Sequence, residues 1–195
     1  MPNSPVHLNI AGNPIGQTAT EFKGVLKLLK EMPQLSGLDL TAIQLKDTVI
    51  PELLDALSSV TTLKELILDG IKVKPSVVDC LRSMITHASL TKLSMVGSFS
   101  RESVLSMIEH GRQNGHKISF LDISGIYFGD ECVPVLADFL RNSPSIETFR
   151  CAGIGLSVSG WHALLNSIKC VFQYSSSVCS IAYTQLVGYT PTLNQ

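Results

Sequence analysis

Apolar residues recur along this chain in pairs separated by one residue, at a nearly constant interval. Residues two apart in a strand point to the same side, so each pair predicts a short strand with one apolar face. The six pairs are Leu8/Ile10, Leu38/Leu40, Leu66/Leu68, Leu93/Met95, Leu121/Ile123 and Phe149/Cys151. Their first members, which we call the anchors, are 30, 28, 27, 28 and 28 residues apart. The pattern therefore predicts six equivalent strands.

A second set of apolar residues follows each strand at helical spacing. In most intervals these residues stand 12, 15 and 19 positions after the anchor. The sets are Ile50/Leu53/Leu57, Val78/Leu81/Ile85, Val133/Leu136/Leu140, Trp161/Leu164/Ile168 and, shifted by two positions, Phe22/Val25/Leu29. The fourth interval keeps Leu105 and Ile108 but has Arg112 in the third place. The change of period from 2 to 3.6 predicts a strand followed by a helix in each interval.

Residues between the strands and helices are typical of turns and helix starts. Asp47, Asp130, Ser100, Ser157 and the sequence Lys74-Pro75-Ser76 are candidate helix N-termini. Four glycines share one place, the fourth residue after an anchor: Gly70, Gly97, Gly125 and Gly153. Their common place predicts turn glycines rather than a phosphate-binding loop.

One strand and one helix of this size cannot bury an apolar stripe without neighbours. Stacking such units side by side makes a continuous core, so the sequence predicts an α/β solenoid of about six units. We expect it to span residues 1–170, with units starting near residues 5, 35, 63, 90, 118 and 146. A parallel sheet would form the concave face and the helices the convex face.

The segments LSGLDLTAIQL, LKELILDGIKV, ISFLDISGIYF and IETFRCAGIGL resemble leucine-rich repeats. The period of 27–30 residues is similar to that of ribonuclease-inhibitor-type repeats, and the resemblance covers about residues 5–170. The Asn or Cys that bonds to the turn backbone in that family is present here as Asn13. Isoleucine replaces it at residues 43, 71, 126 and 154, so those turns must satisfy their amides in another way.

One unit, LDISGIYFGDECVPVLADFLRNSPSIETF, is similar to repeats of the large actin capping-protein regulators of the CARMIL type. In those proteins the segment that engages capping protein lies outside the repeats. The resemblance implies a cytoskeletal scaffold fragment.

Composition narrows the class of protein. The chain has 15 Lys and Arg against 16 Asp and Glu, a net charge of −1, which argues against a nucleic-acid-binding protein. No apolar run is long enough to predict a membrane span, and the N-terminus does not look like a signal peptide. Cysteines 80, 132, 151, 170 and 179 are scattered, as expected of free thiols in a reducing compartment. We therefore expect a cytoplasmic protein.

The chemistry-bearing residues do not form a recognisable catalytic motif. The histidines, at positions 7, 87, 110, 116 and 162, are dispersed over different units. The single tryptophan, Trp161, falls in the core register of its helix. We expect neither metal nor cofactor, and no enzymatic activity.

Strand alternation places the residues next to the anchors on the concave face. Asp39, Glu65 and Asp69 form a mild acidic cluster there beside Ile67, and Phe120 is expected to be an exposed aromatic residue. The candidate partner-binding residues are Asp39, Glu65, Ile67, Asp69, Phe120, Asp122 and Arg150. The main prediction is an interaction module for a protein partner, and the plain alternative is a solvated sheet face.

Two further interpretations stay open. The chain could be a catalytic regulator similar to the leucine-rich-repeat activator of the nuclear-transport GTPase, although it lacks that family's acidic tail and arginine. It could also be a decayed copy, because it opens almost directly on a strand and residues 171–195 carry no charge. We expect that last segment to be a cap or a tail. The start on a strand indicates either that the chain is part of a longer array or that an N-terminal cap is absent.

Overall fold

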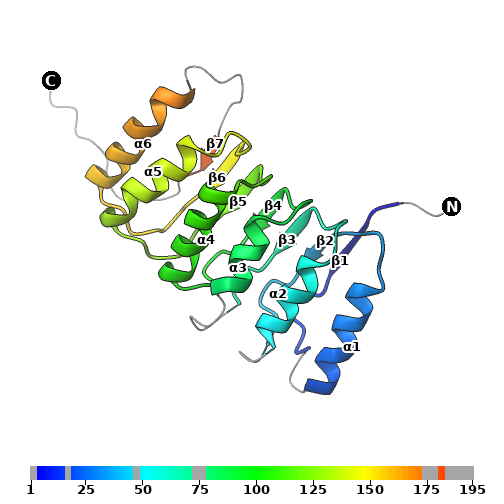
Figure 1. Ribbon diagram of the computed structural model, residues 1–195. Coiled ribbons are helices and arrows are strands. Elements are labelled where there is room, and N and C mark those ends of the chain that lie inside the picture. Colours follow the sequence, from blue (N-terminus) through cyan, green and yellow to red (C-terminus); the bar gives the residue numbers. More distant parts are fainter. Residues whose placement is uncertain (1–3, 16–18, 46–48, 72–77, 173–179, 183–195) are drawn as a thin grey trace, which may run out of the picture.

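Seven parallel strands form one sheet in the order of the sequence (Figure 1). The structure is a computed structural model that describes residues 4–15, 19–45, 49–71, 78–172 and 180–182. The strands are β1 (Val6–Asn9), β2 (Leu35–Asp39), β3 (Glu65–Ile67), β4 (Lys92–Ser94), β5 (Phe120–Asp122), β6 (Thr148–Arg150) and β7 (Ser180–Ala182). The sheet is open, with β1 and β7 at its edges.

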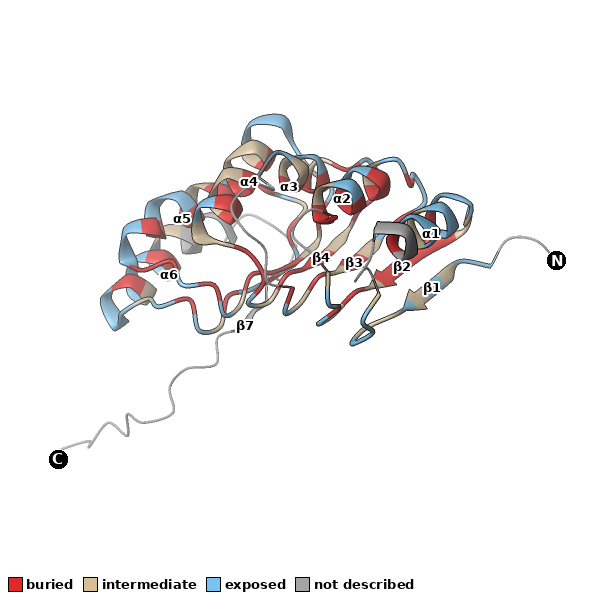
Figure 2. Cartoon of the chain, turned by 90° about the horizontal axis from the view of Figure 1, so that it is seen from below, coloured by how far each residue is buried: buried red, intermediate tan, exposed pale blue. Residues whose placement is uncertain are grey.

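A helix follows each of the first six strands. The helices are α1 (Ala19–Lys30), α2 (Ile50–Ser58), α3 (Val78–Ile85), α4 (Arg101–Asn114), α5 (Val133–Arg141) and α6 (Val158–Phe172), with a 3-10 turn, η2 (Asp130–Cys132), before α5. All six helices lie on the same side of the sheet (Figure 2). The predicted α/β class, with parallel strands alternating with helices, is confirmed.

The anchors form one row across the sheet. Leu38, Leu66, Leu93, Leu121 and Phe149 occupy equivalent places in neighbouring strands, and each is at most 1% exposed. They pack into a core with the buried helical residues Leu53, Leu57, Leu81, Leu136 and Leu164. Because side chains alternate along a strand, the residues on either side of each anchor must face away from the helices.

The fourth residue after each anchor adopts a positive φ. These residues are Gly12, Ala42, Gly70, Gly97, Gly125 and Gly153, with φ values between 51° and 72°. The four glycines that the sequence placed in turns are confirmed there. Ala42 is the one residue other than glycine with a positive φ in the described ranges.

The turn amides bond to the neighbouring turn. The first five of these turn residues each donate the N–H to the carbonyl of the third residue after the next anchor, over 2.7–2.9 Å. The pairs are Gly12 to Thr41, Ala42 to Asp69, Gly70 to Val96, Gly97 to Ser124 and Gly125 to Ala152. This ladder is how turns without an Asn side chain satisfy their amides.

Two side chains supplement the ladder. The Nδ2 of Asn13 donates to the carbonyls of Ile10 and Ala11 at 3.1 and 3.2 Å. At the same place after β4, the Ser98 hydroxyl donates to the Leu68 carbonyl at 2.5 Å and accepts from the Ile71 N–H at 3.2 Å. The Asn13 amide therefore bonds within its own turn, whereas the Ser98 hydroxyl joins the turn after β4 to the turn after β3.

Two of the predicted helix caps are confirmed. The Ser100 hydroxyl accepts from the Ser103 N–H at the start of α4, and the Ser157 hydroxyl accepts from the Gly160 N–H at the start of α6. Asp47 and residues 74–76 lie outside the described residues, as do residues 173–179 and 183–195 of the C-terminal segment.

Asp130 was a candidate helix N-terminus, and a helical segment does begin there. Asp130 is the first residue of η2, whose N-terminus at Gly129 has no side-chain cap. Its carboxylate accepts instead from the Ser157 N–H at 2.8 Å and from the Ser157 hydroxyl at 2.5 Å. These bonds lower the pKa of Asp130 and join the loop before α5 to the loop before α6.

Candidate functional site

The face of the sheet opposite the helices carries two rows of side chains, one on each side of the anchor row. The first row contains His7, Gly37, Glu65, Lys92, Phe120 and Thr148. The second contains Asn9, Asp39, Ile67, Ser94, Asp122 and Arg150. Both rows are in register from strand to strand, so residues 27–30 apart in sequence become direct neighbours.

A hollow of about 350 Å³ lies over β3 to β6 on this face. We call it the Phe120 hollow. Its lining residues are Ile67, Asp69, Lys92, Ser94, Phe120, Asp122 and Arg150. Five of the seven predicted residues therefore meet here. Lys92 and Ser94 were not among those predicted, although each stands next to the anchor Leu93, and that adjacency was the available signal.

Phe120 lies between two cations. The Lys92 Nζ is 5.6 Å from the centroid of its ring, and the Arg150 guanidinium carbon is 5.0 Å from it. These distances are within the range of cation–π attraction. The two cations cover part of the ring, so Phe120 is half-buried and not fully exposed as expected from the sequence.

Glu65 is paired with Lys92. The Lys92 Nζ is 3.2 Å from the Glu65 Oε2, on the adjacent strand. The ion pair compensates one charge of the predicted acidic cluster. It also holds Lys92 beside Phe120, because the ammonium lies between the carboxylate on β3 and the ring on β5.

The aspartates of the face organise the turns. The Asp39 Oδ1 accepts from the Thr41 N–H at 2.9 Å, the Asp122 Oδ1 from the Ser124 N–H at 3.0 Å, and the Asp69 Oδ1 from the Val96 N–H at 2.8 Å. Asp122 is 7% exposed. Three of the four carboxylates that the sequence suggested for partner binding therefore hold the backbone just after β2, β4 and β5.

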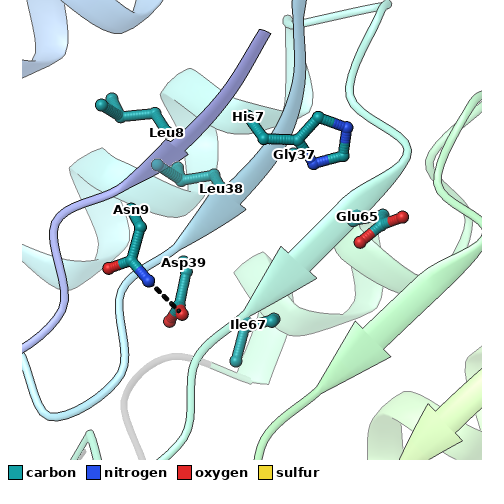
Figure 3. Close-up of a pocket in the computed structure, with 8 residues that line it drawn as sticks. All are labelled: His7, Leu8, Asn9, Gly37, Leu38, Asp39, Glu65 and Ile67. Carbon is teal, nitrogen blue, oxygen red and sulfur yellow. Dashed lines mark hydrogen bonds between the residues drawn. The ribbon is translucent and has the colours of Figure 1, made fainter. Parts of the chain in front are cut away.

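The remaining two predicted residues, Asp39 and Glu65, line a second hollow of about 200 Å³ over β1 to β3, which Ile67 also borders (Figure 3). There the Asn9 Nδ2 donates to the Asp39 Oδ2 at 2.9 Å. The His7 ring lies over Gly37, where a Cβ atom would collide with it. The predicted acidic cluster is thus divided between the two hollows.

Cys132, His116 and Trp161, which lie outside the two hollows, pack against other residues of the fold. Burial raises the pKa of the Cys132 thiol, which contacts the Phe128 carbonyl at 3.4 Å. The His116 ring stacks on Phe139 with a centroid distance of 5.3 Å. Trp161 packs against the core, as its register predicted. Within the described ranges, no three His, Cys, Asp or Glu side chains gather as a metal site would need.

The described helices include none with the length and apolar character needed to span a membrane. A comparison of the chain with protein-family models and with curated protein sequences finds no match.

Proposed function

We propose that this chain is a leucine-rich-repeat module that binds a protein partner on the helix-free face of its sheet. The fold component of the proposal rests on the 27–30-residue period, the in-register anchors and the six helices on one side. In this proposal the units stack as a horseshoe-shaped solenoid, and binding comes from shape and charge complementarity without bond-making.

The observation that carries the binding proposal is the Phe120 hollow. A half-buried aromatic ring flanked by Lys92 and Arg150 resembles the aromatic and arginine anchors found at the centres of protein interfaces. Ile67 adds a half-buried apolar side chain on the same face. The ring, the guanidinium and the apolar side chain are held by strands, so little conformational entropy is lost when a partner docks.

The test is affinity capture from cell extract with the full chain and with a Phe120→Ala variant. We expect Phe120→Ala to lose at least one partner that the wild type retains. A matched control is His162→Ala, on the exposed face of α6. Equal capture by Phe120→Ala and wild type, with both variants folded by circular dichroism, would remove this face from consideration.

A GTP-hydrolysis assay with a panel of small GTPases separates the binding proposal from the catalytic-regulator alternative. We expect the rate of hydrolysis to stay at its intrinsic value in the presence of the chain. Stimulated turnover that is lost in Arg150→Ala would favour the alternative.

A further inference from the structure

Arg150 differs from the other four arginines of the chain. Each of those donates to an oxygen acceptor on its own or a neighbouring element. The pairs are Arg82 with Asp79, Arg101 with Glu131, Arg112 with Glu109 and Arg141 with the Ser167 carbonyl. Arg150 is exposed, and among the described residues its guanidinium contacts the Phe120 ring alone. Within the described ranges the guanidinium therefore contacts the ring while its N–H groups have no acceptor.

The strand neighbour of Arg150 on β5 is Asp122, and its carboxylate does not pair with the guanidinium. The two residues are partners in the register of β5 and β6. The Asp122 side chain is almost fully covered and its Oδ1 accepts the Ser124 N–H, and no ion pair with Arg150 forms in the described part of the chain. The other cation of the hollow, Lys92, is already paired with Glu65.

A cation–π contact uses the charge of the guanidinium and not its N–H groups, and the planar fork of those N–H groups suits bidentate bonding to a carboxylate. We propose that Arg150 is the anchor of a carboxylate-binding subsite in the Phe120 hollow, and that the partner is an extended protein segment that places one Asp or Glu side chain there. This inference rests on the proposed function, because it specifies the chemistry of the partner on the same face.

The sheet also sets the spacing of the partner's side chains. Arg150 is on β6 and Ile67 is on β3, three strand spacings away, which is about 14 Å. An extended segment covers that distance in about four residues. The segment therefore carries Asp or Glu at one end and an apolar residue about four positions away, where it contacts Ile67 and the edge of Phe120.

The experiment uses the labelled full chain on an array of random decapeptides. Every peptide with Asp or Glu is printed beside its Asn or Gln counterpart. We expect the binders to contain a carboxylate with an apolar residue three to five positions away, and their amide counterparts to bind weakly. The affinity for a recovered peptide is then measured by fluorescence anisotropy.

Four variants test whether the peptide affinity depends on Arg150. Arg150→Gln should weaken binding roughly 10- to 100-fold, as expected for loss of a charged hydrogen-bond pair, and Arg150→Lys should recover part of it. Asp122→Asn keeps the acceptor for the Ser124 N–H but removes a neighbouring negative charge, so binding should tighten roughly two- to fivefold. The control is Lys117→Gln, which removes an exposed positive charge just before β5 and should leave binding unchanged.

The outcomes separate the two proposals. Two results would overturn the carboxylate subsite: peptides whose amide counterparts bind with the same affinity, and peptides whose affinity does not change in Arg150→Gln. If those peptides still lose affinity in Phe120→Ala, the proposal of a binding face remains supported. An array without binders would also overturn the subsite. Failure of the binding face itself would show separately, as cell-extract capture that does not change in Phe120→Ala.

Discussion

Ala42 occupies a turn position that glycine fills in the five equivalent turns. Its φ of 51° lies in the left-handed region, where a side chain costs about 1–2 kcal/mol. The turn tolerates this because the Ala42 N–H bonds to the Asp69 carbonyl at 2.7 Å and Asp39 holds the preceding Thr41. The neighbouring hydrogen bonds thus determine a conformation that the residue itself disfavours.

Ala42→Gly should raise the free energy of unfolding by about 0.5–1 kcal/mol, because relief of the strain exceeds the extra entropy of glycine in the unfolded chain. The reverse change in an equivalent turn, Gly125→Ala with φ 72°, should lower it by about 1–2 kcal/mol. Urea denaturation measures both. The same sign for the two variants would contradict the common turn geometry.

Two histidines make stability depend on pH. Burial lowers the pKa of His87, partly offset by the carbonyls of Leu57 and Val60, and burial also lowers the pKa of His116. In the described structure the Nε2 of His87 has no hydrogen-bond partner, while His116 contacts the Ser143 hydroxyl at 2.8 Å. A proton on either ring is therefore less favourable in the folded state.

Stability should accordingly be constant above the unfolded histidine pKa of about 6.5 and fall as pH drops below it. There the unfolded chain binds protons that the folded chain does not, until the pH passes the lower folded pKa values. Urea midpoints between pH 7.5 and 5 should fall less in a His87→Asn/His116→Asn variant than in wild type. His162→Asn, at an exposed site, is the control and should keep the wild-type slope.

Helices α3 and α4 approach each other closely at a glycine. Gly111 is buried in α4, and a Cβ atom there would lie 2.7 Å from the Cδ1 of Ile85 at the end of α3. The glycine thus sets how near the two helices approach. Gly24 lies in the exposed part of α1, where a Cβ atom would meet no neighbouring atom within 4 Å, so it has no such role.

Alanine should act in opposite directions at these two glycines. Gly24→Ala should stabilise the protein by about 0.5–1 kcal/mol through helix propensity alone. Gly111→Ala should destabilise it by about 1 kcal/mol or more, because overpacking against Ile85 exceeds the same propensity gain. Thermal and urea unfolding measure both. Stabilisation by both variants would show that α3 and α4 adjust without cost.

Over the whole molecule the core is built in series, and each strand except the edge strands β1 and β7 has a neighbouring strand on both sides. Leu93, in the middle of the sheet, is fully buried, whereas its counterpart Leu8 in the edge strand β1 is only partly buried. Position in the array, and not residue type, therefore decides how much free energy an anchor contributes.

Leu93→Ala should lower the free energy of unfolding by about 2–5 kcal/mol, as expected for a fully buried leucine. Leu8→Ala should cost about 1 kcal/mol, because less apolar area is removed from the core. Urea denaturation checks the ranking. Equal losses would indicate that β1 is as well covered in solution as β4.

The period of apolar residues was enough to predict β1 to β6, the helices and the parallel sheet, because strand and helix repeat distances are local properties of the backbone. Ser100, Ser157 and the four turn glycines were predicted for the same reason. The period did not predict β7, because that strand lies in the C-terminal segment outside the repeat register. The hydrogen bonds between Asp130 and Ser157 were not predicted, because the two residues are 27 apart in the sequence and meet only when neighbouring units stack.

In the candidate site, too, some features follow from the local sequence and others depend on contacts between distant residues. Strand alternation identified Ile67, Phe120 and Arg150 as residues of one face, since that depends on the sequence alone. Only the register of neighbouring strands brought Lys92 and Arg150 to the two sides of the Phe120 ring and paired Lys92 with Glu65. Which charges remain available to a partner depends on contacts between residues 27–30 apart, and those are set by the packing of the strands.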